Sequence, residues 1–285
     1  MFKGLSPGAI GVRAGTLDEG IAAAKTGGFG GVEFNPGEVA DLIAAQGVEA
    51  ARDKFAVSGL QPAGWGLPTD WRGSEESWRA GINDLPRLAQ AASSIGGTRV
   101  STWIMPCSDE REMDENVRFH VTRFQPIAKI LGDHGVSLGL EFIGPKTLRD
   151  TQAYPFIHTM SGMLALGREI GPNVGLLLDA FHWYTSHGTL DDLKALTPAQ
   201  VVYVHVNDAP VGVAVDEQQD GTRALPGETG VIDIAGFLQA LKGIGYDGPV
   251  TPEPFKKELA TLPSDEARLK TVGAAMDVIW QRGGL

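Results

Sequence analysis

The chain has 285 residues, of which 42% are hydrophobic and 21% are charged, as in ordinary globular proteins. Its formal net charge of −11 at pH 7 disfavours nucleic acid as a partner, because phosphates are bound by clustered lysines and arginines. The sequence shows neither a signal-peptide pattern nor an apolar run long enough to cross a bilayer. We therefore expect a cytoplasmic protein without membrane contacts.

Strand and helix patterns then alternate along the whole chain. Strands are expected over Gly8–Val12, Val32–Phe34, Leu60–Gly64, Arg99–Ile104, Ser137–Phe142, Val174–Leu178, Val201–Val206 and Val250–Glu253. Helices are expected over Leu17–Lys25, Glu38–Val57 with an interruption near Gly47, Glu75–Ser94, Asp109–Gly135 with a kink or break at Pro126, Phe156–Ile170, Leu190–Leu196, Ile234–Ile244 and Asp265–Trp280. This alternation predicts a single α/β domain over residues 1–285, folded as a (β/α)8 TIM barrel. A doubly wound open sheet is the alternative.

Four of the expected strands end in a side chain that can bind a metal ion. The four are Glu141, Asp179, His205 and Glu253. Because active sites of such barrels lie at the carboxyl ends of the strands, these side chains are expected to meet in the mouth of the barrel. Taken singly, an acid at a strand end often caps a helix, and a lone histidine is often only hydrogen-bonded. Four on one face together favour a metal site.

Three carboxylates and one imidazole suit one divalent cation of hard or borderline character. We expect Mn²⁺, with Mg²⁺, Co²⁺, Fe²⁺ and Zn²⁺ as alternatives. Such an ion polarises a ketone and its neighbouring hydroxyl group and so stabilises an enediolate, while a carboxylate removes and returns a carbon-bound proton. The expected partner is therefore a small keto-hydroxy molecule such as a sugar or a cyclitol.

Four more residues near strand ends are candidates for substrate contact. His182 closely follows one of the predicted ligands and either binds a substrate oxygen or supports the site from behind. Trp65, Trp103 and Trp183 lie near the ends of other predicted strands. They either wall a sugar pocket or pack in the core.

A segment without a clear apolar period, residues 209–230, follows the strand that ends near His205. Loops of this length in compact domains are usually functional, and this one starts on the face where barrel active sites lie. Arg223 is its lone cation and precedes a Pro-Gly turn. We therefore expect Arg223 to reach the substrate, with a surface arginine as the alternative.

These residues lie in motifs similar to those of the xylose isomerase-like barrel family of sugar isomerases and epimerases. The matching stretches are Leu140–Gly144, Asn173–His182, His205–Asp208, Asp220–Arg223, Pro226–Asp233 and Gly245–Glu253. The similarity covers the second half of the chain through motifs and the first half mainly through the order of elements. Within the family, the members that isomerise keto-cyclitols are the most similar.

The resemblance implies roles for the same residues. The implied metal ligands are Glu141, Asp179, His205 and Glu253. The two glutamates would also act as acid and base, and His182 and Arg223 would contact the substrate. Because each glutamate stays deprotonated beside a cation, each can serve as ligand and base. The resemblance also implies a homo-oligomer.

The expected function is thus a metal-dependent isomerase or epimerase of a keto-cyclitol or a ketose. A ketose 3-epimerase, a keto-sugar lyase or dehydratase, and a non-catalytic sugar-binding barrel are the alternatives. Ketose 3-epimerases often carry a further glutamate shortly after the ligand on the fifth strand, and Thr147 and its neighbours offer none. The intact pair of glutamates favours catalysis over binding alone.

Overall fold

The computed structural model describes residues 1–285, and its main sheet consists of parallel strands. These are β1 (Phe2–Leu5), β2 (Gly31–Val32), β3 (Gln61–Pro62), β4 (Trp65–Gly66), β5 (Arg99–Ile104), β7 (Ser137–Phe142), β9 (Val174–Asp179), β10 (Val201–Val206) and β11 (Pro249–Pro252). Their order across the sheet is β3-β2-β1-β11-β10-β9-β7-β5-β4. The last strand of the chain therefore pairs with the first.

The two edges of this order, β3 and β4, are successive pieces of one extended segment. The Gln61 N–H donates to the Gly30 carbonyl oxygen on one side, and the Leu67 N–H donates to the Ser101 carbonyl oxygen on the other. The segment thus joins β2 to β5, and the sheet closes into a barrel. A separate pair of short antiparallel strands, β6 (Cys107–Ser108) and β8 (Tyr154–Pro155), lies outside it.

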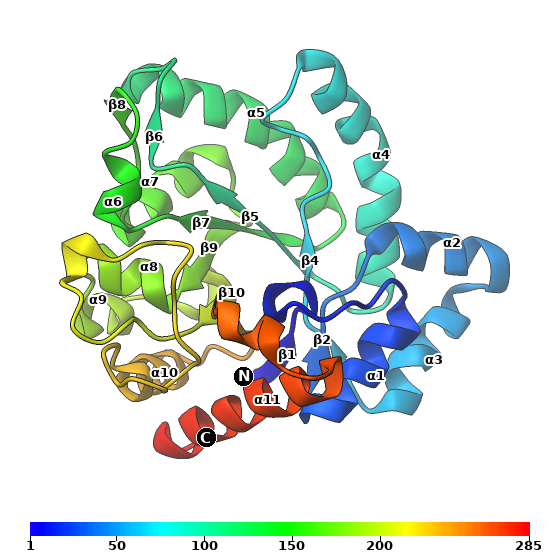
Figure 1. Ribbon diagram of the computed structural model, residues 1–285. Helices are drawn as coiled ribbons and strands as arrows, with labels where there is room; N and C mark the ends of the chain where they lie inside the picture. The colour runs from blue at the N-terminus through cyan, green and yellow to red at the C-terminus, as the bar shows by residue number, and fades with distance from the viewer.

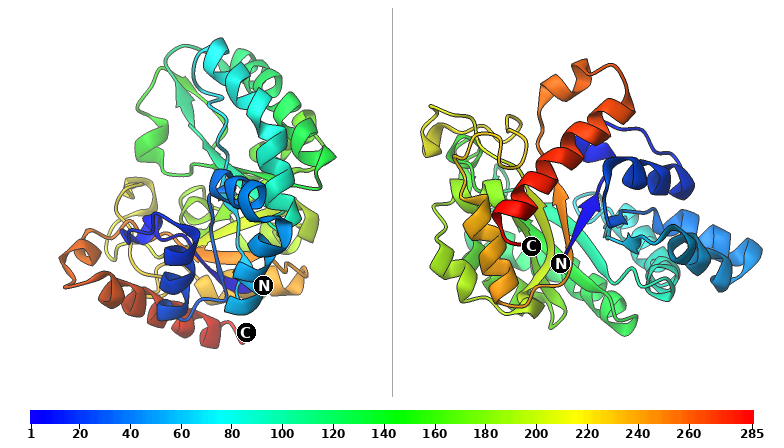
Figure 2. Two further views of the ribbon diagram at one scale, coloured as in Figure 1. Left: turned by 90° about the vertical axis from the view of Figure 1, so that its right-hand side faces the viewer. Right: turned by 90° about the horizontal axis from the view of Figure 1, so that it is seen from below.

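Helices surround the barrel on its outer side (Figure 1). The longer ones are α1 (Leu17–Gly27), α2 (Pro36–Gln46), α3 (Val48–Ser58), α4 (Glu75–Ser94), α5 (Met113–Asp133), α7 (Met160–Ile170), α10 (Ile234–Gly243) and α11 (Asp265–Arg282). Shorter ones are α6 (Lys146–Arg149), α8 (Ala180–Thr185) and α9 (Leu190–Lys194), with 3-10 turns η1 (Gly8–Ile10), η2 (Pro198–Gln200), η3 (Val215–Glu217) and η4 (Lys257–Thr261). The two further views in Figure 2 show the chain ends near each other. None of the helices combines the length and the apolar character needed to cross a membrane.

The predicted TIM barrel is confirmed, and several elements have the predicted bounds, among them α4, β5, β7 and β10. The predicted helix over residues 38–57 is interrupted at Gly47, whose φ is 87°. Glycine adopts such a backbone without strain, so the chain turns there and continues as α3. Pro126 lies inside α5 and does not end it.

The prediction of a first strand over Gly8–Val12 is wrong. The strand is β1, four residues long, and the predicted segment instead begins with the turn η1. Gly11 closes this turn with φ 72° in the left-handed region. Ile10 within the turn is nevertheless buried. The apolar residues that suggested a strand are therefore apolar because they pack in the core, not because they pair in the sheet.

Two helices also differ from expectation. Helix α8 directly follows β9 and has no counterpart among the predicted helices. Helix α7 begins at Met160 rather than near Phe156, because the Thr159 side chain caps it by accepting from the Gly162 N–H.

Tyr203 fills the interior of the barrel. Its side chain is buried, its hydroxyl donates to Glu33 Oε1 at 2.8 Å, and it lies 2.8 Å from Thr251 Oγ1. The neighbouring strands leave room for the ring, since a Cβ atom on Gly64 would lie 2.6 Å from Tyr203 Cε2. His205 follows two residues later on the same side of β10, so the ring forms the floor beneath it.

We predict that Gly64→Ala destabilises the protein by about 1–3 kcal/mol, because the new methyl group would overlap a ring held in place by hydrogen bonds. Gly66→Ala is the matched control, since a Cβ atom there would meet no atom within 4 Å. Urea unfolding of both variants measures the difference. Equal stability of the two variants would contradict this account of the barrel interior.

Candidate metal centre and active site

The four predicted ligands come from neighbouring strands and meet at their carboxyl ends. Glu141 lies in β7, Asp179 ends β9, His205 lies in β10, and Glu253 directly follows β11. Asp179 and His205 are register partners in the sheet. One potential ligand atom from each of the four residues lies within 4.8 Å of the others. The structure therefore brings the complete predicted set together.

Two buried atoms of this cluster have no hydrogen-bond partner, Glu141 Oε1 and His205 Nδ1. They lie 3.6 Å apart, and His205 Nδ1 is 3.5 Å from Glu253 Oε2 and 3.9 Å from Asp179 Oδ2. Buried polar atoms are normally paired, so these orphans point to a missing partner. Two ligands each about 2.1 Å from one ion lie roughly 3–3.5 Å apart. The donor set therefore fits one divalent cation after small side-chain adjustments.

Asp179 serves two purposes. Its Oδ1 accepts from the backbone N–H groups of Phe181 and His182, at 2.6 and 3.1 Å, and so caps helix α8. Its Oδ2 faces the cluster. The Asn207 amide donates to both carboxylate oxygens, at 3.2 and 3.0 Å. Asp179 can therefore cap helix α8 through Oδ1 and still offer Oδ2 to a metal ion, because the helix fixes the orientation of the carboxylate.

Arg223 lies inside the site rather than on the surface. Its Nη1 donates to Asp179 Oδ2 at 3.0 Å and to Glu253 Oε2 at 2.9 Å. Its guanidinium group lies between two aromatic rings, 4.8 Å from the centroid of Phe181 and 4.5 Å from that of Phe255. The surface alternative for Arg223 is thus excluded.

Arg223 lies in the segment 209–230, and hydrogen bonds hold this segment to the rest of the chain. Asp208 accepts from the backbone N–H groups of Thr229, Gly230 and Ile232, at 3.0, 2.8 and 3.0 Å. The Thr147 hydroxyl donates to the Gln218 carbonyl oxygen at 2.7 Å. The loop is therefore held against the barrel mouth by many contacts within the chain.

The charges in the cluster compensate one another. Burial raises the pKa of the Glu141 carboxyl group. Burial acts in the same direction on Asp179 and Glu253, but Arg223 beside Asp179 and His205 beside Glu253 outweigh it and hold both pKa values below their usual range. Burial lowers the pKa of His205, and Glu253 and Glu141 reverse this and raise it well above its usual value. The carboxylates thus need nearby positive charge to stay ionised.

His182 presents one ring nitrogen to the site. Its Nδ1 lies 3.3 Å from the Gly144 N–H donor, and its Nε2 faces Arg223 Nη2, which can only donate. Nε2 lies 3.8 Å from Glu141 Oε1 and 3.2 Å from Arg223 Nη2. The side chain is buried. It therefore lies beside the cluster, with its Nε2 between Glu141 and Arg223.

The three predicted tryptophans occupy different environments. Trp103 pairs in register with Glu141, so its ring lies beside the cluster, and it is 45% exposed. Trp65 pairs with the core residue Val100, and its indole nitrogen donates to the Gly97 carbonyl oxygen near the amino end of the sheet. Only Trp103 among these residues can line the mouth.

Trp183 is also part of the core. Its indole nitrogen donates to the Thr189 carbonyl oxygen at 3.3 Å, and its ring packs against Phe237 with centroids 5.5 Å apart. The structure therefore places Trp65 and Trp183 away from the mouth, because helix and strand packing decide where a large ring at a strand end points.

Three residues at the site had no predicted role. Asn207 shares the side of β10 on which His205 lies, two positions later, and strand alternation alone would have indicated it. Asp220 Oδ1 accepts from Arg223 Nη2 at 2.8 Å, and its spacing of three residues gave no signal inside an irregular loop. Phe255 has φ 38°, which is unusual for a bulky residue and is not readable from sequence.

Residues 21–279 match the model of the family described as xylose isomerase-like TIM barrel. The chain therefore belongs to the xylose isomerase-like TIM barrel family. Inosose isomerase of Bacillus subtilis (strain 168) is 31% identical over 204 residues, which cover 70% of this chain and 68% of that protein.

Solved structures show the same fold. A xylose isomerase domain protein from Alicyclobacillus acidocaldarius subsp. acidocaldarius has a TM-score of 0.84 and 30% identity, and the match covers 99% of both chains. The IOLI protein, whose crystal structure contains a zinc atom, has a TM-score of 0.77 and 19% identity over the full length of both chains. At that identity the second likeness concerns the fold alone.

We predict that His205→Ala lowers metal affinity by roughly 100-fold or more, since even residues that only orient ligands account for about 10- to 100-fold. The barrel should remain folded by circular dichroism. His134→Ala, at the end of α5 and outside the cluster, should bind metal like the wild type. Elemental analysis of the dialysed proteins measures metal content. Equal metal content in the His205 and His134 variants would contradict the assignment.

Proposed function

We propose that this chain is a divalent-metal-dependent isomerase or epimerase of a keto-cyclitol or a ketose, most similar in activity to inosose isomerase. The observation that carries the proposal is the cluster of Glu141, Asp179, His205 and Glu253, with two buried ligand-type atoms left unpaired. The identity to inosose isomerase over most of the chain supports the choice of substrate class.

The proposed reaction needs one contribution from the metal ion and another from side chains of the protein. A divalent ion held by the four residues would supply positive charge that polarises the substrate carbonyl group. Of the candidates, Mn²⁺ fits three oxygen ligands and one nitrogen ligand best. The remaining task is to move a proton from the carbon next to the carbonyl group, and this task falls to side chains of the protein.

Glu141 and Glu253 are the proposed acid–base residues. They come from β7 and β11, which lie on either side of β9 and β10 in the sheet, so they approach the cluster from different directions. One glutamate removes the carbon-bound proton, and the electron pair of the broken C–H bond forms the enediolate. In an isomerisation the same glutamate returns the proton to the former carbonyl carbon, and the proton of the neighbouring hydroxyl group passes to the former carbonyl oxygen. In an epimerisation the other glutamate delivers a proton to the opposite face.

Two donors would orient the substrate. Arg223 Nη1 already bridges Asp179 and Glu253, and Arg223 Nη2 lies beside His182 Nε2. Arg223 donates to Asp179, Glu253 and Asp220, so a substrate oxygen that it binds would replace one of these acceptors. The exposed ring of Trp103 can cover one face of a sugar.

A panel of keto-cyclitols, ketoses and keto-sugar dehydratase substrates, assayed with and without chelator, tests the proposal. Isomerisation or epimerisation that chelation abolishes and Mn²⁺ restores is the expected result. Elimination of water from one of these compounds would show that the protein is a dehydratase instead. Binding without turnover throughout the panel would favour a non-catalytic sugar-binding barrel.

We predict that Glu253→Gln retains much of its metal but loses turnover by roughly 10²–10⁴-fold, because the amide oxygen can still bind an ion but cannot take a proton. Glu141→Gln should behave likewise if it is the proton carrier. Glu217→Gln, an exposed glutamate on the loop that carries Arg223, is the control and should keep wild-type kinetics. Steady-state kinetics and elemental analysis are the readouts. Near wild-type turnover by both site variants would remove the proposed roles.

A further inference from the structure

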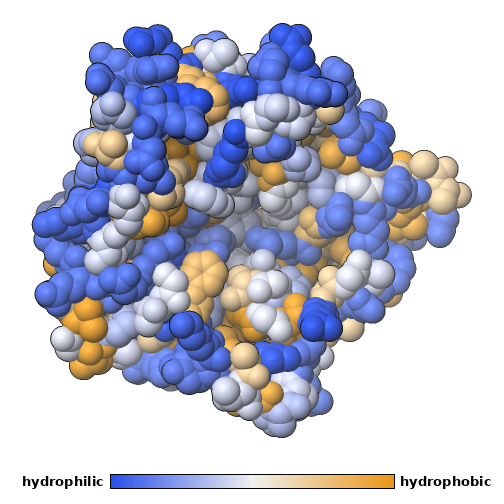
Figure 3. Space-filling view, turned by 45° about the horizontal axis from the view of Figure 1, so that its top comes forward, coloured by the Kyte–Doolittle hydropathy of each residue, from blue (hydrophilic) through white to orange (hydrophobic).

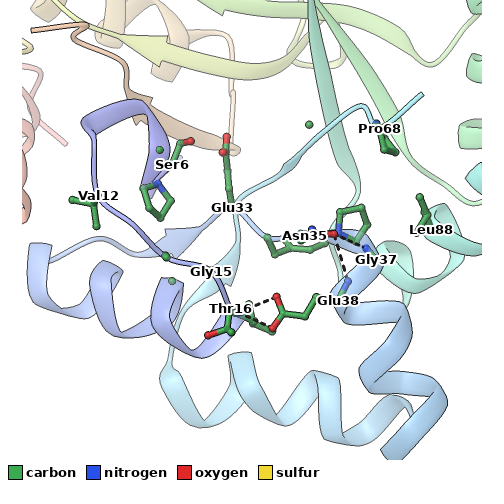
Figure 4. Close-up of a pocket in the computed structure, with 18 of the residues that line it drawn as sticks. Ser6, Val12, Gly15, Thr16, Glu33, Asn35, Gly37, Glu38, Pro68 and Leu88 are labelled. Atoms are coloured by element: carbon green, nitrogen blue, oxygen red, sulfur yellow. Dashed lines mark hydrogen bonds between the residues drawn. The ribbon is translucent and has the colours of Figure 1, made fainter. Parts of the chain in front are cut away.

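A cavity of about 560 Å³ lies at the carboxyl ends of β1, β2 and β4, beside the strand that leads to Glu253. In Figure 4, Ser6 and Glu33 lie on one side of it and Pro68 and Leu88 on the other. Ser6 follows β1, which pairs with β11, and Glu33 follows β2, which pairs with the other side of β1. Because adjacent strands are about 4.8 Å apart, Glu33 lies roughly 10 Å from Glu253 across the barrel mouth. A molecule the size of a sugar can span that distance.

Glu33 is the side chain that connects this cavity to the barrel. Its Oε1 accepts from the Tyr203 hydroxyl at 2.8 Å, and Tyr203 forms the floor beneath His205. Glu33 is half-buried and lines the cavity. Its carboxylate is therefore held in a fixed place by the barrel interior, with the cavity in front of it.

No cation in the cavity wall is free to pair with Glu33. Arg87 is the one lysine or arginine among the lining residues. Its Nε donates to Asp84 Oδ1 at 2.8 Å, and its Nη1 lies 3.6 Å from Asp41 Oδ1. A phosphate or carboxylate group entering the cavity would therefore meet carboxylates without a compensating guanidinium group.

The helix ends that face the cavity do not supply anion-binding groups either. At the start of α2, Asn35 Oδ1 accepts from the N–H groups of Gly37 and Glu38, at 2.8 and 3.4 Å. At the start of α1, both oxygens of Glu38 accept from the Leu17 N–H, at 2.8 and 3.0 Å. Figure 4 shows these bonds along the cavity wall. The place that an external anion would take is thus occupied by the Glu38 carboxylate at α1 and by the Asn35 amide oxygen at α2.

We propose that this cavity is the subsite for the part of the substrate that is remote from the metal cluster, and that Glu33 accepts hydrogen bonds there from hydroxyl groups. The subsite selects an uncharged polyhydroxylated group and rejects a phosphorylated or carboxylated one. This inference rests on the proposed function in that the keto end of the same molecule lies at the cluster. Figure 3 shows that this face of the molecule is hollowed near its centre, with hydrophilic and hydrophobic residues both at the rim.

The test compares two neutral polyols, myo-inositol and D-fructose, with the phosphate ester of each, by calorimetric titration of the Mn²⁺-loaded protein. Wild-type protein should bind the neutral compounds at least roughly 100-fold more tightly than the esters, because like charges in an interface are strongly disfavoured. Glu33→Gln should weaken neutral binding about tenfold, through loss of a charge-assisted hydrogen bond, and should narrow the preference against the esters. Glu33→Asp should keep that preference. Glu258→Gln, an exposed residue outside the cavity, is the charge-matched control and should change neither.

Equal binding of ester and neutral compound by the wild type would overturn the inference, as would unchanged binding by Glu33→Gln or absence of binding by both polyols. Glu33-dependent binding without turnover of any keto-sugar would leave the subsite standing and remove the proposed function. If the protein turns over a keto-sugar and its binding of polyols does not depend on Glu33, the proposed function is supported and the proposed subsite is contradicted.

Discussion

Two buried carboxylates and a partly buried one, Glu253, surround one imidazole at the carboxyl ends of β7, β9, β10 and β11. This concentration of negative charge is the constraint on which the site depends. Burying a charge is expensive unless it is paired. In the chain itself, Arg223 and His205 supply the positive charge, and Asn207 supplies further hydrogen bonds to Asp179. Glu141 Oε1 is left without a partner, which is where a divalent ion would complete the balance.

The surrounding structure can be understood as the means of holding these groups. The barrel sets their spacing, because the strands that carry them are hydrogen-bonded neighbours. Tyr203 closes the barrel beneath His205, and helix α8 holds Asp179 by its N-terminal N–H groups. The loop over residues 209–230 brings Arg223 across the top. The site is consequently built mainly on rigid elements, which is what the proposed proton transfer at a fixed distance requires.

The fold and the cluster of candidate ligands were predictable because both follow from short-range patterns. Buried parallel strands appear as compact apolar runs, and a polar residue at the end of such a run stands out, as Asp179 does after Leu178. The first strand was missed because β1 has only four residues and includes Gly4, whereas the apolar residues around Ile10 belong to a turn. Residues such as Phe255 and Glu33 act through tertiary neighbours, and sequence spacing does not reveal which side chains those are. The same reason explains why Trp65 and Trp183 were expected near the mouth and lie in the core.

In the proposed reaction, Glu141 or Glu253 moves a proton at the carbon beside a carbonyl group. The most direct measurement is the reaction carried out in D₂O with a turned-over keto-cyclitol or ketose, followed by NMR, together with the rate for substrate deuterated at that carbon. We expect one deuterium at the carbon next to the carbonyl group in the product or, where the proton is carried without solvent exchange, a primary isotope effect. Product that forms without deuterium at that carbon and without any isotope effect, under conditions where the chemical step limits the rate, would contradict it.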